Sequence, residues 1–262
     1  MKKTGNNAAK GRKKNRPMQA LIVVLILVAA FSLYKVISIA LEYKAGSDVY
    51  QEAQELVIAV DENDEILSKY KVDFETLRDT NSQVQGWLVL PDSKINYPVV
   101  QGSDNQKYLT RLYTGEINSK GSLFIDFRCE ENFGGHKTVI YGHHMKDGSM
   151  FAGLLKYRKQ SYYKTHPYMI LVTPEATYKA EIFASMTLEA TDELYNASKK
   201  SKKARLYEIK DIKNGSDIDA DVKVKSSDKI LLLSTCAYDF DDARYAVFAR
   251  LDKISDSEEG KN

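Results

Sequence analysis

The sequence predicts a mainly β protein in which eight short strands form a closed barrel or a sandwich, preceded by helices. From Asn81 onwards, short β-prone runs alternate with Gly, Pro, Asn and Asp, the pattern of an all-β domain. Before them, residues 18–41 form a long apolar segment. The chain has 262 residues, 43% of them hydrophobic, which is enough for one sizeable domain with appendages.

The N-terminus predicts a membrane anchor. Residues 1–17 carry seven Lys and Arg side chains and no acid, and Lys35 is the one charged residue of the largely apolar stretch Met18–Leu41. A helix of that length is about 36 Å long, enough to cross a bilayer core of about 30 Å. Positive charge on the N-terminal side favours a cytoplasmic N-terminus. We therefore expect a cytoplasmic tail (1–17), a single-pass transmembrane helix (18–41) and an extracellular remainder in the cell membrane; a cleaved signal peptide is the alternative.

Residues 42–80 are predicted to form a helical stalk. Apolar residues recur near the 3.6-residue helical period from Tyr50 to Val60, and Asp73–Leu77 continues the pattern after an acidic break. Glu and Lys dominate the other positions, which suits a helix that packs on the domain with one face.

The barrel is expected over residues 81–253, followed by a polar tail at 254–262. Its strands are predicted at Gly86–Leu90, Asn96–Val100, Gly121–Asp126, Lys137–Tyr141, Tyr168–Val172, Thr177–Ala184, Lys229–Thr235 and Tyr245–Leu251. The Lys- and Glu-rich insertion Thr191–Asn214 has helical spacing and ends at Gly215, which predicts a solvated helix lying across the barrel.

Cys236 is the first candidate for chemistry. It ends the apolar run Leu231–Leu233, where the sequence turns polar, and the next strand starts near Arg244. If the two strands form a hairpin, a thiol and a guanidinium stand at neighbouring strand ends, where the guanidinium can stabilise an oxyanion. Alternatively, Cys236 is a buried hydrophobe or pairs with Cys129 in a disulfide, and Arg244 pairs with an adjacent aspartate.

A nucleophilic thiol needs an imidazole nearby. His143 and His144 follow Gly142 at the end of the apolar run Val139–Tyr141. They are therefore expected where this strand ends and a loop begins, as Cys236 is on its own strand. Alternation places the two histidines on opposite faces but does not say which one meets the thiol. The alternative is a zinc site whose ligands would be Cys129, His136, His143 and His144. The spacings between these residues are not typical of zinc sites, so we predict no metal and no cofactor.

Three motifs together resemble the sortase family. They are Tyr141-Gly-His-His-Met, Leu233-Ser-Thr-Cys and Asp242-Ala-Arg, similar to the family's His, Cys and Arg signatures. The class B branch fits best, because segments resembling its early barrel strands also occur: Gly86-Trp-Leu, Ile95-Asn-Tyr-Pro-Val-Val-Gln-Gly-Ser-Asp-Asn, Tyr108-Leu and Gly121-Ser-Leu-Phe-Ile-Asp. The resemblance spans about residues 74–251.

The resemblance implies an eight-stranded sortase-type β-barrel with a helix-bearing insertion before the cysteine strand. It further implies that Cys236 attacks the Thr carbonyl of an Asn-Pro-x-Thr-like sorting motif on a secreted protein. Arg244 would hold the oxyanion, and His143, which directly follows the family's glycine, would protonate the leaving amine. Ser234 and Thr235 are predicted to contact the substrate. A cell-wall amine, or its lipid-linked peptidoglycan precursor, would then release the thioacyl enzyme.

Two other functions remain open. A sortase that polymerises pilins or mainly hydrolyses its substrate would share every motif, and a membrane-tethered binding domain would hold Cys236 as a structural residue. A nucleic-acid partner is not expected, since the chain beyond residue 17 has a net charge of about −5.

Overall fold

The computed structural model describes residues 16–59, 70–197, 200–237, 239 and 241–256. The chain divides into two compact units, Met1–Lys44 and Ala45–Asn262. The predicted tail at 1–17 lies outside the described residues except for its last two positions, and so does the polar tail after residue 256.

The first unit consists of the apolar part of helix α1 (Arg16–Gln54). Its most apolar window has a mean hydropathy of 2.7, and no residue in that window is buried. Among the described residues, α1 is the one helix long and apolar enough to cross a membrane. These properties fit the predicted anchor, and they also fit a signal sequence.

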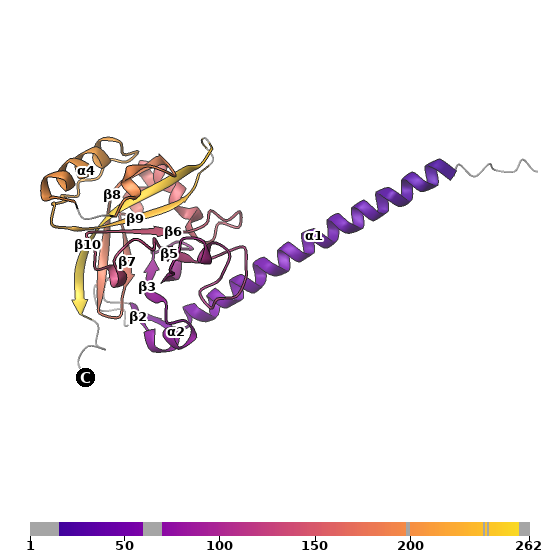
Figure 1. Cartoon of the computed structure of the whole chain (residues 1–262), viewed down its shortest axis with the longest axis horizontal. Coiled ribbons are helices and arrows are strands. Elements are labelled where there is room, and N and C mark those ends of the chain that lie inside the picture. Colours follow the sequence, from indigo (N-terminus) through magenta and orange to yellow (C-terminus); the bar gives the residue numbers. More distant parts are fainter. Residues whose placement is uncertain (1–15, 60–69, 198–199, 238, 240, 257–262) are drawn as a thin grey trace, which may run out of the picture. The chain divides into compact units, whose positions relative to one another are not determined.

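The second unit is built on a closed eight-stranded barrel (Figure 1). Around the barrel the order is β10-β8-β7-β3-β4-β5-β6-β9, and β9 closes it against β10. The strands are β3 (Val84–Val89), β4 (Asn96–Gln101), β5 (Leu123–Ile125), β6 (Lys137–Tyr141), β7 (Tyr168–Val172), β8 (Ala176–Glu189), β9 (Lys229–Cys236) and β10 (Ala243–Asp256). The predicted closed barrel is confirmed.

Two neighbouring pairs, β4–β5 and β6–β9, are parallel, and the others are antiparallel. The parallel β6–β9 pair is important for function because both strands run to the same end of the barrel. β5, β7 and β9 are rich in Ile and Leu and are buried along most of their length, as expected for strands covered on both faces.

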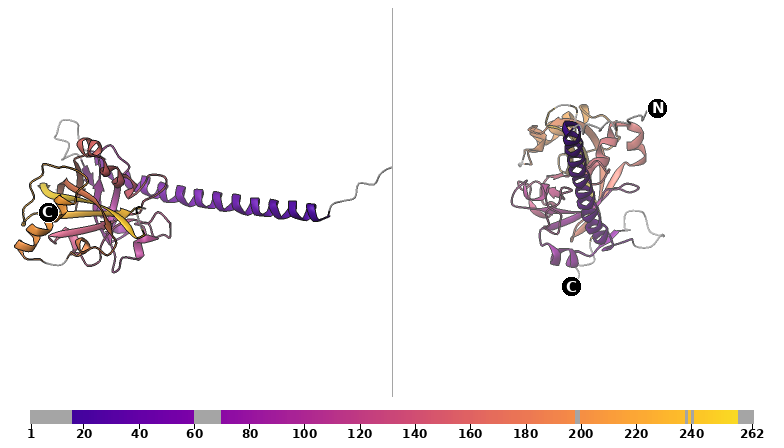
Figure 2. Two further views of the ribbon diagram at one scale, coloured as in Figure 1. Left: turned by 90° about the horizontal axis from the view of Figure 1, so that it is seen from above. Right: turned by 90° about the vertical axis from the view of Figure 1, so that its right-hand side faces the viewer.

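Short helices connect the strands on the outside of the barrel (Figure 2). They are the 3-10 helices η1 (Lys107–Leu109), η2 (Glu131–Phe133), η3 (Phe151–Arg158) and η4 (Glu193–Tyr195), and the α-helices α3 (Gln160–Thr165) and α4 (Lys202–Asn214). A buried ion pair between Lys137 of β6 and Glu208 fixes α4 on the barrel, and the Lys137 ammonium also donates to the Leu194 carbonyl at 2.8 Å.

The predicted helical stalk at residues 42–80 contains two short strands between its helices. Helix α1 ends at Gln54, and β1 (Val57–Ala59) pairs with β2 (Tyr70–Val72) before α2 (Phe74–Thr80) begins. The segment that contains β1 has helical spacing, but Val57 is β-branched, and such residues favour strands. The predicted helix at Asp73–Leu77 is present, and the Asp73 carboxylate caps it by accepting from the Thr76 amide at 3.0 Å.

The insertion helix is shorter than predicted, and the last strand is longer. Helix α4 starts at Lys202 because Ser201 caps it, accepting from the Ala204 amide at 3.2 Å, and it ends at Gly215 as expected. β10 continues to Asp256, paired with β8 over its length, so residues 254–256 belong to the barrel and not to the predicted tail.

Candidate active site

The end of the β9–β10 hairpin brings the first two candidate residues together. Cys236 and Arg244 are direct partners across the antiparallel pair, and the Ala237 amide donates to the Ala243 carbonyl at 2.9 Å beyond them. The predicted hairpin is confirmed. Thiol and guanidinium therefore belong to adjacent positions at one strand end.

His143 reaches the same end of the barrel from β6. Tyr141 is the register partner of Ser234 in the parallel pair, and the Gly142 amide donates to the Ser234 carbonyl at 3.1 Å. His143 lies two residues beyond Tyr141, and Cys236 lies two residues beyond Ser234. Parallel strands run in one direction, so both side chains leave the sheet at the same edge.

A hydrogen bond fixes the imidazole of His143. Its Nε2 lies 2.6 Å from the carbonyl oxygen of Leu109, and because a carbonyl can only accept, Nε2 carries the proton. Nδ1 is then the ring atom left to exchange a proton. The half-buried ring thus has a defined tautomer and a defined orientation.

Gly121 packs directly against this ring. Its φ is +58°, and a Cβ there would lie 3.0 Å from Cδ2 of His143 and 2.7 Å from the carbonyl oxygens of Tyr108 and Leu109. The hydroxyl of Tyr50, near the end of α1, donates to the Gly121 carbonyl at 2.5 Å. The loop that orients the imidazole is therefore held from both sides, and only glycine fits at its closest point.

Arg244 has an uncommitted guanidinium. Nη1 donates a hydrogen bond to the Ala243 carbonyl at 3.3 Å, and no carboxylate in the described part of the chain forms an ion pair with the guanidinium. The alternative pairing with Asp241 or Asp242 is therefore absent from these residues. The half-buried guanidinium can accept an anionic oxygen without first breaking a salt bridge.

Cys129 and Cys236 differ sharply in environment. Both are free thiols, so the disulfide reading is wrong. Cys129 is 7% exposed, its Sγ accepts a hydrogen bond from the Val139 amide at 3.4 Å, and burial raises its pKa to about 11. Cys236 is partly exposed at the strand end. The geometry therefore favours Cys236 as the accessible nucleophile and Cys129 as a core residue.

The residues of the zinc alternative do not meet. Among the described residues, no group of three or more His, Cys, Asp and Glu side chains could hold a metal ion. His136 lies in a hollow with Arg205, and burial lowers its pKa. His144 bridges to the Met150 backbone and lines a different hollow, beside Lys94.

Comparison with known proteins agrees with this arrangement. A family model described as "Sortase domain" matches residues 88–252, which include most of the barrel and all three candidate residues. The chain belongs to the sortase family.

Individual relatives place it in class B. Sortase B of Staphylococcus aureus is 31% identical over 244 residues, covering 91% of this chain and 96% of that protein. Sortase B of Listeria monocytogenes is 30% identical, covering 89% and 96%. Among solved structures, a sortase B-like protein of Bacillus anthracis superposes with a TM-score of 0.70 at 33% identity, covering 81% of this chain and 98% of that one. The enzyme is a sortase B-type cysteine transpeptidase of the surface-protein anchoring kind, acting on sorting-signal substrates.

The predicted substrate contacts Ser234 and Thr235 lie inside the sortase barrel wall. Their exposed fractions are 1% and 2%. The Ser234 hydroxyl shares a 2.9 Å hydrogen bond with the hydroxyl of Tyr195, whose ring stacks on Tyr141 with centroids 6.0 Å apart. In this state both side chains are shielded from solvent, and Ser234 positions Tyr195.

Sequence reasoning missed the residues that support the sortase site. Tyr195 interacts electrostatically with both Arg244 and Cys236, and burial raises its pKa to about 12, so its hydroxyl stays protonated. An aromatic residue in a Lys- and Glu-rich insertion is a signal that could have identified it. Leu109 and Gly121 act through a backbone carbonyl and close packing, and Tyr50 through a hydroxyl that reaches a residue distant in the chain. The sequence carries no comparable signal for these contacts.

Proposed function

We propose that this chain is a membrane-anchored transpeptidase that cleaves an Asn-Pro-x-Thr-like C-terminal sorting motif of secreted surface proteins after Thr. It then transfers the acyl group to a cell-wall amine. The observation that carries the proposal is the pairing of Cys236 with Arg244 at the strand end, beside His143 on the parallel strand.

In the first step, the Cys236 thiolate attacks the Thr carbonyl and forms a C–S bond. Arg244 receives the developing oxyanion through charge-assisted hydrogen bonds. Nδ1 of His143 has first taken the proton of the Cys236 thiol, because Nε2 is engaged by Leu109. The C–N bond then breaks, and the leaving amine takes this proton from Nδ1. The result is a thioacyl enzyme and a released peptide amine.

In the second step, an amine replaces the thiol. The acceptor nitrogen attacks the thioester carbonyl, Nδ1 of His143 takes its proton, and the C–S bond breaks to return the Cys236 thiolate. A solved structure of S. aureus sortase B is a substrate complex, and a further sortase B structure is a complex with triglycine. Those relatives support a peptide donor and a peptide-like amine acceptor for this chain.

We place the enzyme at the cell membrane with its catalytic unit outside. Seven positive charges in residues 1–17 precede the apolar part of α1, and such charge stays on the cytoplasmic side. A cell-wall amine is accessible only on the other side.

The test is product analysis with the full-length enzyme in a non-ionic detergent. Sorting peptides with Asn-Pro-x-Thr and scrambled sequences are incubated with amine acceptors, and mass spectrometry follows the thioacyl enzyme and its products. We expect an adduct on Cys236 and an amide product from the sorting peptide alone. An adduct elsewhere, or products that contain only hydrolysed peptide, would contradict the proposal.

A further inference from the structure

The C-terminal end of α1 belongs to the catalytic unit. The first compact unit ends at Lys44, and residues 46–54, which we call the docked segment, continue the same helix as part of the second unit. Tyr50 and Ala53 of this segment are only 3% and 1% exposed. The Gln54 side-chain amide donates to the carbonyl of the first residue of β4 at 2.8 Å. One helix therefore contains both the apolar segment and a packed part of the enzyme.

The docked segment contacts the loop formed by residues 118–122 at two points. A Cβ at Gly46 would lie 2.8 Å from Oδ1 of Asn118, so the helix backbone lies directly against this side chain. One turn further along the helix, the Tyr50 hydroxyl donates to the Gly121 carbonyl at 2.5 Å. Burial raises the pKa of Tyr50, so the hydroxyl keeps its proton and remains a donor. The helix thus holds the loop near both of its ends.

The loop in turn holds the backbone on both sides of Leu109, whose carbonyl orients the catalytic imidazole. On one side, the Ser122 amide donates to the Tyr108 carbonyl at 3.0 Å. On the other side, the Asn118 amide donates to the Thr110 carbonyl at 3.0 Å. The Leu109 oxygen between them lies 2.6 Å from Nε2 of the imidazole. The position of this oxygen therefore depends on the loop, and the position of the loop depends on the docked segment.

A buried ion pair connects the same loop to the segment that follows His143. The ammonium of Lys120, a side chain that is 2% exposed, donates to the Asp147 carboxylate at 2.5 Å. Within that following segment, the Phe151 amide donates to the His143 carbonyl at 2.9 Å. The loop thus supports the histidine twice, through the Leu109 carbonyl at the ring and through Asp147 beyond the backbone.

We propose that Tyr50 is a positioning residue for the reaction, acting on His143 through the loop that its hydroxyl holds. The inference rests on the proposed function, because there Nδ1 of His143 takes the thiol proton. Without the Tyr50 hydroxyl, the Gly121 carbonyl loses a buried donor, which is unfavourable, and the loop shifts. The Leu109 oxygen then moves away from Nε2, and the tautomer with its proton on Nδ1 becomes populated. That tautomer cannot accept the thiol proton at Nδ1.

Nitrogen NMR measures the tautomer of His143 directly and needs no substrate. The full-length protein, labelled with 15N-histidine, is held in a non-ionic detergent at about pH 8.5, where an ordinary imidazole is neutral. The spectrum of His143→Ala assigns the signal. We expect the wild type to carry the proton on Nε2. Tyr50→Phe should shift the tautomer ratio at least about fivefold towards the Nδ1 form, the effect of losing one hydrogen bond.

The rate of thioacyl formation tests the consequence for catalysis. Tyr50→Phe keeps the aromatic ring and removes only the hydroxyl. Its kcat should fall about tenfold, because proton transfer at the imidazole is slowed. Its KM for the sorting peptide should stay within about twofold of the wild type, because the hydroxyl acts on the histidine and not on the bound peptide. A general loss of structure would not separate the two constants in this way.

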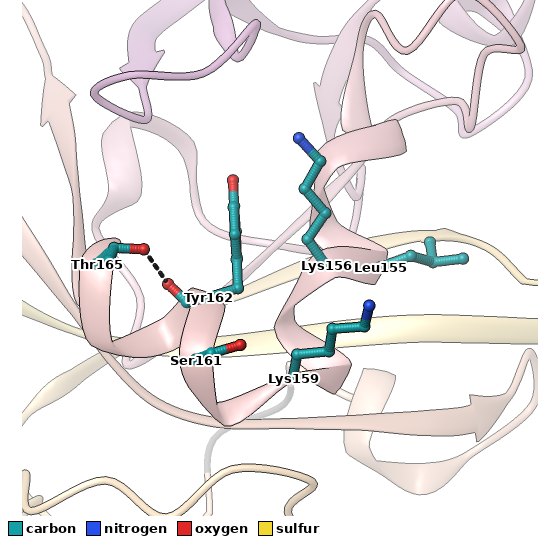
Figure 3. A pocket seen from close by; sticks show the side chains of 6 residues that line it. All are labelled: Leu155, Lys156, Lys159, Ser161, Tyr162 and Thr165. Atoms are coloured by element: carbon teal, nitrogen blue, oxygen red, sulfur yellow. Dashed lines mark hydrogen bonds between the residues drawn. The ribbon is translucent and has the colours of Figure 1, made fainter.

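Tyr157→Phe is the matched control. Tyr157 is fully buried, and its hydroxyl donates to the His166 carbonyl at 2.8 Å. Its ring packs edge-on against Tyr162, with centroids 5.0 Å apart, and Tyr162 lines a hollow formed by residues of η3 and α3 (Figure 3). Each substitution removes one buried hydroxyl that donates to a carbonyl, so both should lower the melting temperature by a few degrees. Only Tyr50→Phe should change the tautomer ratio and kcat.

A double substitution tests the route of the effect. Gly121→Ala displaces the same loop, since its Cβ would lie 2.7 Å from the Leu109 oxygen. Adding Tyr50→Phe to Gly121→Ala should lower kcat by less than about twofold more, because both changes act on one element. A further tenfold loss would overturn the proposal, as would a wild-type tautomer ratio in Tyr50→Phe or equal changes in Tyr157→Phe. If the wild type formed no thioacyl enzyme but the tautomer still shifted, the proposed reaction would be refuted and the effect of Tyr50 on the ring supported.

Discussion

Replacing Gly121 by alanine should inactivate the enzyme although residue 121 takes no part in the chemistry. The new Cβ would lie 2.7 Å from two carbonyl oxygens, one of them the Leu109 oxygen that holds His143, and 3.0 Å from the imidazole. Real Cβ atoms do not approach so closely, so the loop must shift and the Nε2 hydrogen bond must lengthen or break. A displacement of about 1 Å at a reacting group lowers the rate about 100-fold.

Gly115→Ala is the matched control. Gly115 also has a positive φ, +96°, but nothing lies within 4 Å of a Cβ placed there. Both substitutions carry the backbone strain of an L-residue at positive φ, about 1–2 kcal/mol, which lowers the melting temperature by a few degrees. Only Gly121→Ala adds a clash with the Leu109 carbonyl and with the imidazole that this carbonyl holds.

The assay is the rate of thioacyl formation, with melting temperatures for both variants. We expect kcat/KM to fall about 100-fold in Gly121→Ala and to stay within about threefold of wild type in Gly115→Ala. If Gly121→Ala remained active at a similar melting temperature, the idea that this loop orients the imidazole would be refuted. Equal losses in both variants would attribute the effect to strain alone.

Three further predictions concern the candidate catalytic residues. Cys236→Ala should abolish thioacyl formation, while Cys129→Ala retains it. A methanethiosulfonate should label Cys236 much faster than Cys129, because Cys129 is buried and its pKa is raised to about 11. An inactive Cys129→Ala with an active Cys236→Ala would reverse the assignment. Arg244→Lys should slow turnover about 100-fold, or about 3 kcal/mol, because an ammonium does not reproduce the planar donor fork; near-normal turnover would reduce the residue to a counter-ion. His143→Ala should abolish transfer, whereas His144→Ala should keep at least about a tenth of the transfer rate, a loss of at most about 1.4 kcal/mol in transition-state stabilisation. The opposite result, with the same peptide and amine, would show that His144 on the other face of the strand exchanges protons with the thiol.

Sequence reasoning located the strand ends well because strand signals are local. β6 and β7 begin and end where the apolar runs predicted, and β9 extends the predicted run by one residue to Cys236. The hairpin partner of Cys236 followed from seven intervening residues with turn character. Such short-range patterns depend on neighbouring residues alone, so they can be recognised without knowledge of the fold.

Prediction was weaker where tertiary contacts decide between local alternatives. The segment at Val57–Ala59 has helical spacing and β-branched residues at once, and pairing with β2 determined the outcome. Cys129 lies among the charged residues Arg128, Glu130 and Glu131, a sequence environment typical of an exposed loop. The thiol instead turns inward to the Val139 amide while Arg128 pairs with Asp126.

The sequence by itself determined a domain of eight short strands, the apolar N-terminal helix and the candidate residues at strand ends, because hydrophobic periodicity and residue type are properties of the chain. Periodicity left a barrel and a sandwich open, and the tertiary structure shows the closed barrel. Only the tertiary structure decided that β6 and β9 are parallel neighbours, which brings His143 to the edge that holds Cys236. It alone also decided the supports of the imidazole, since Leu109 and Gly121 act through backbone atoms that any residue type supplies or through the absence of a side chain. Contacts of this kind depend on where distant segments meet, and that placement arises from packing of the whole barrel.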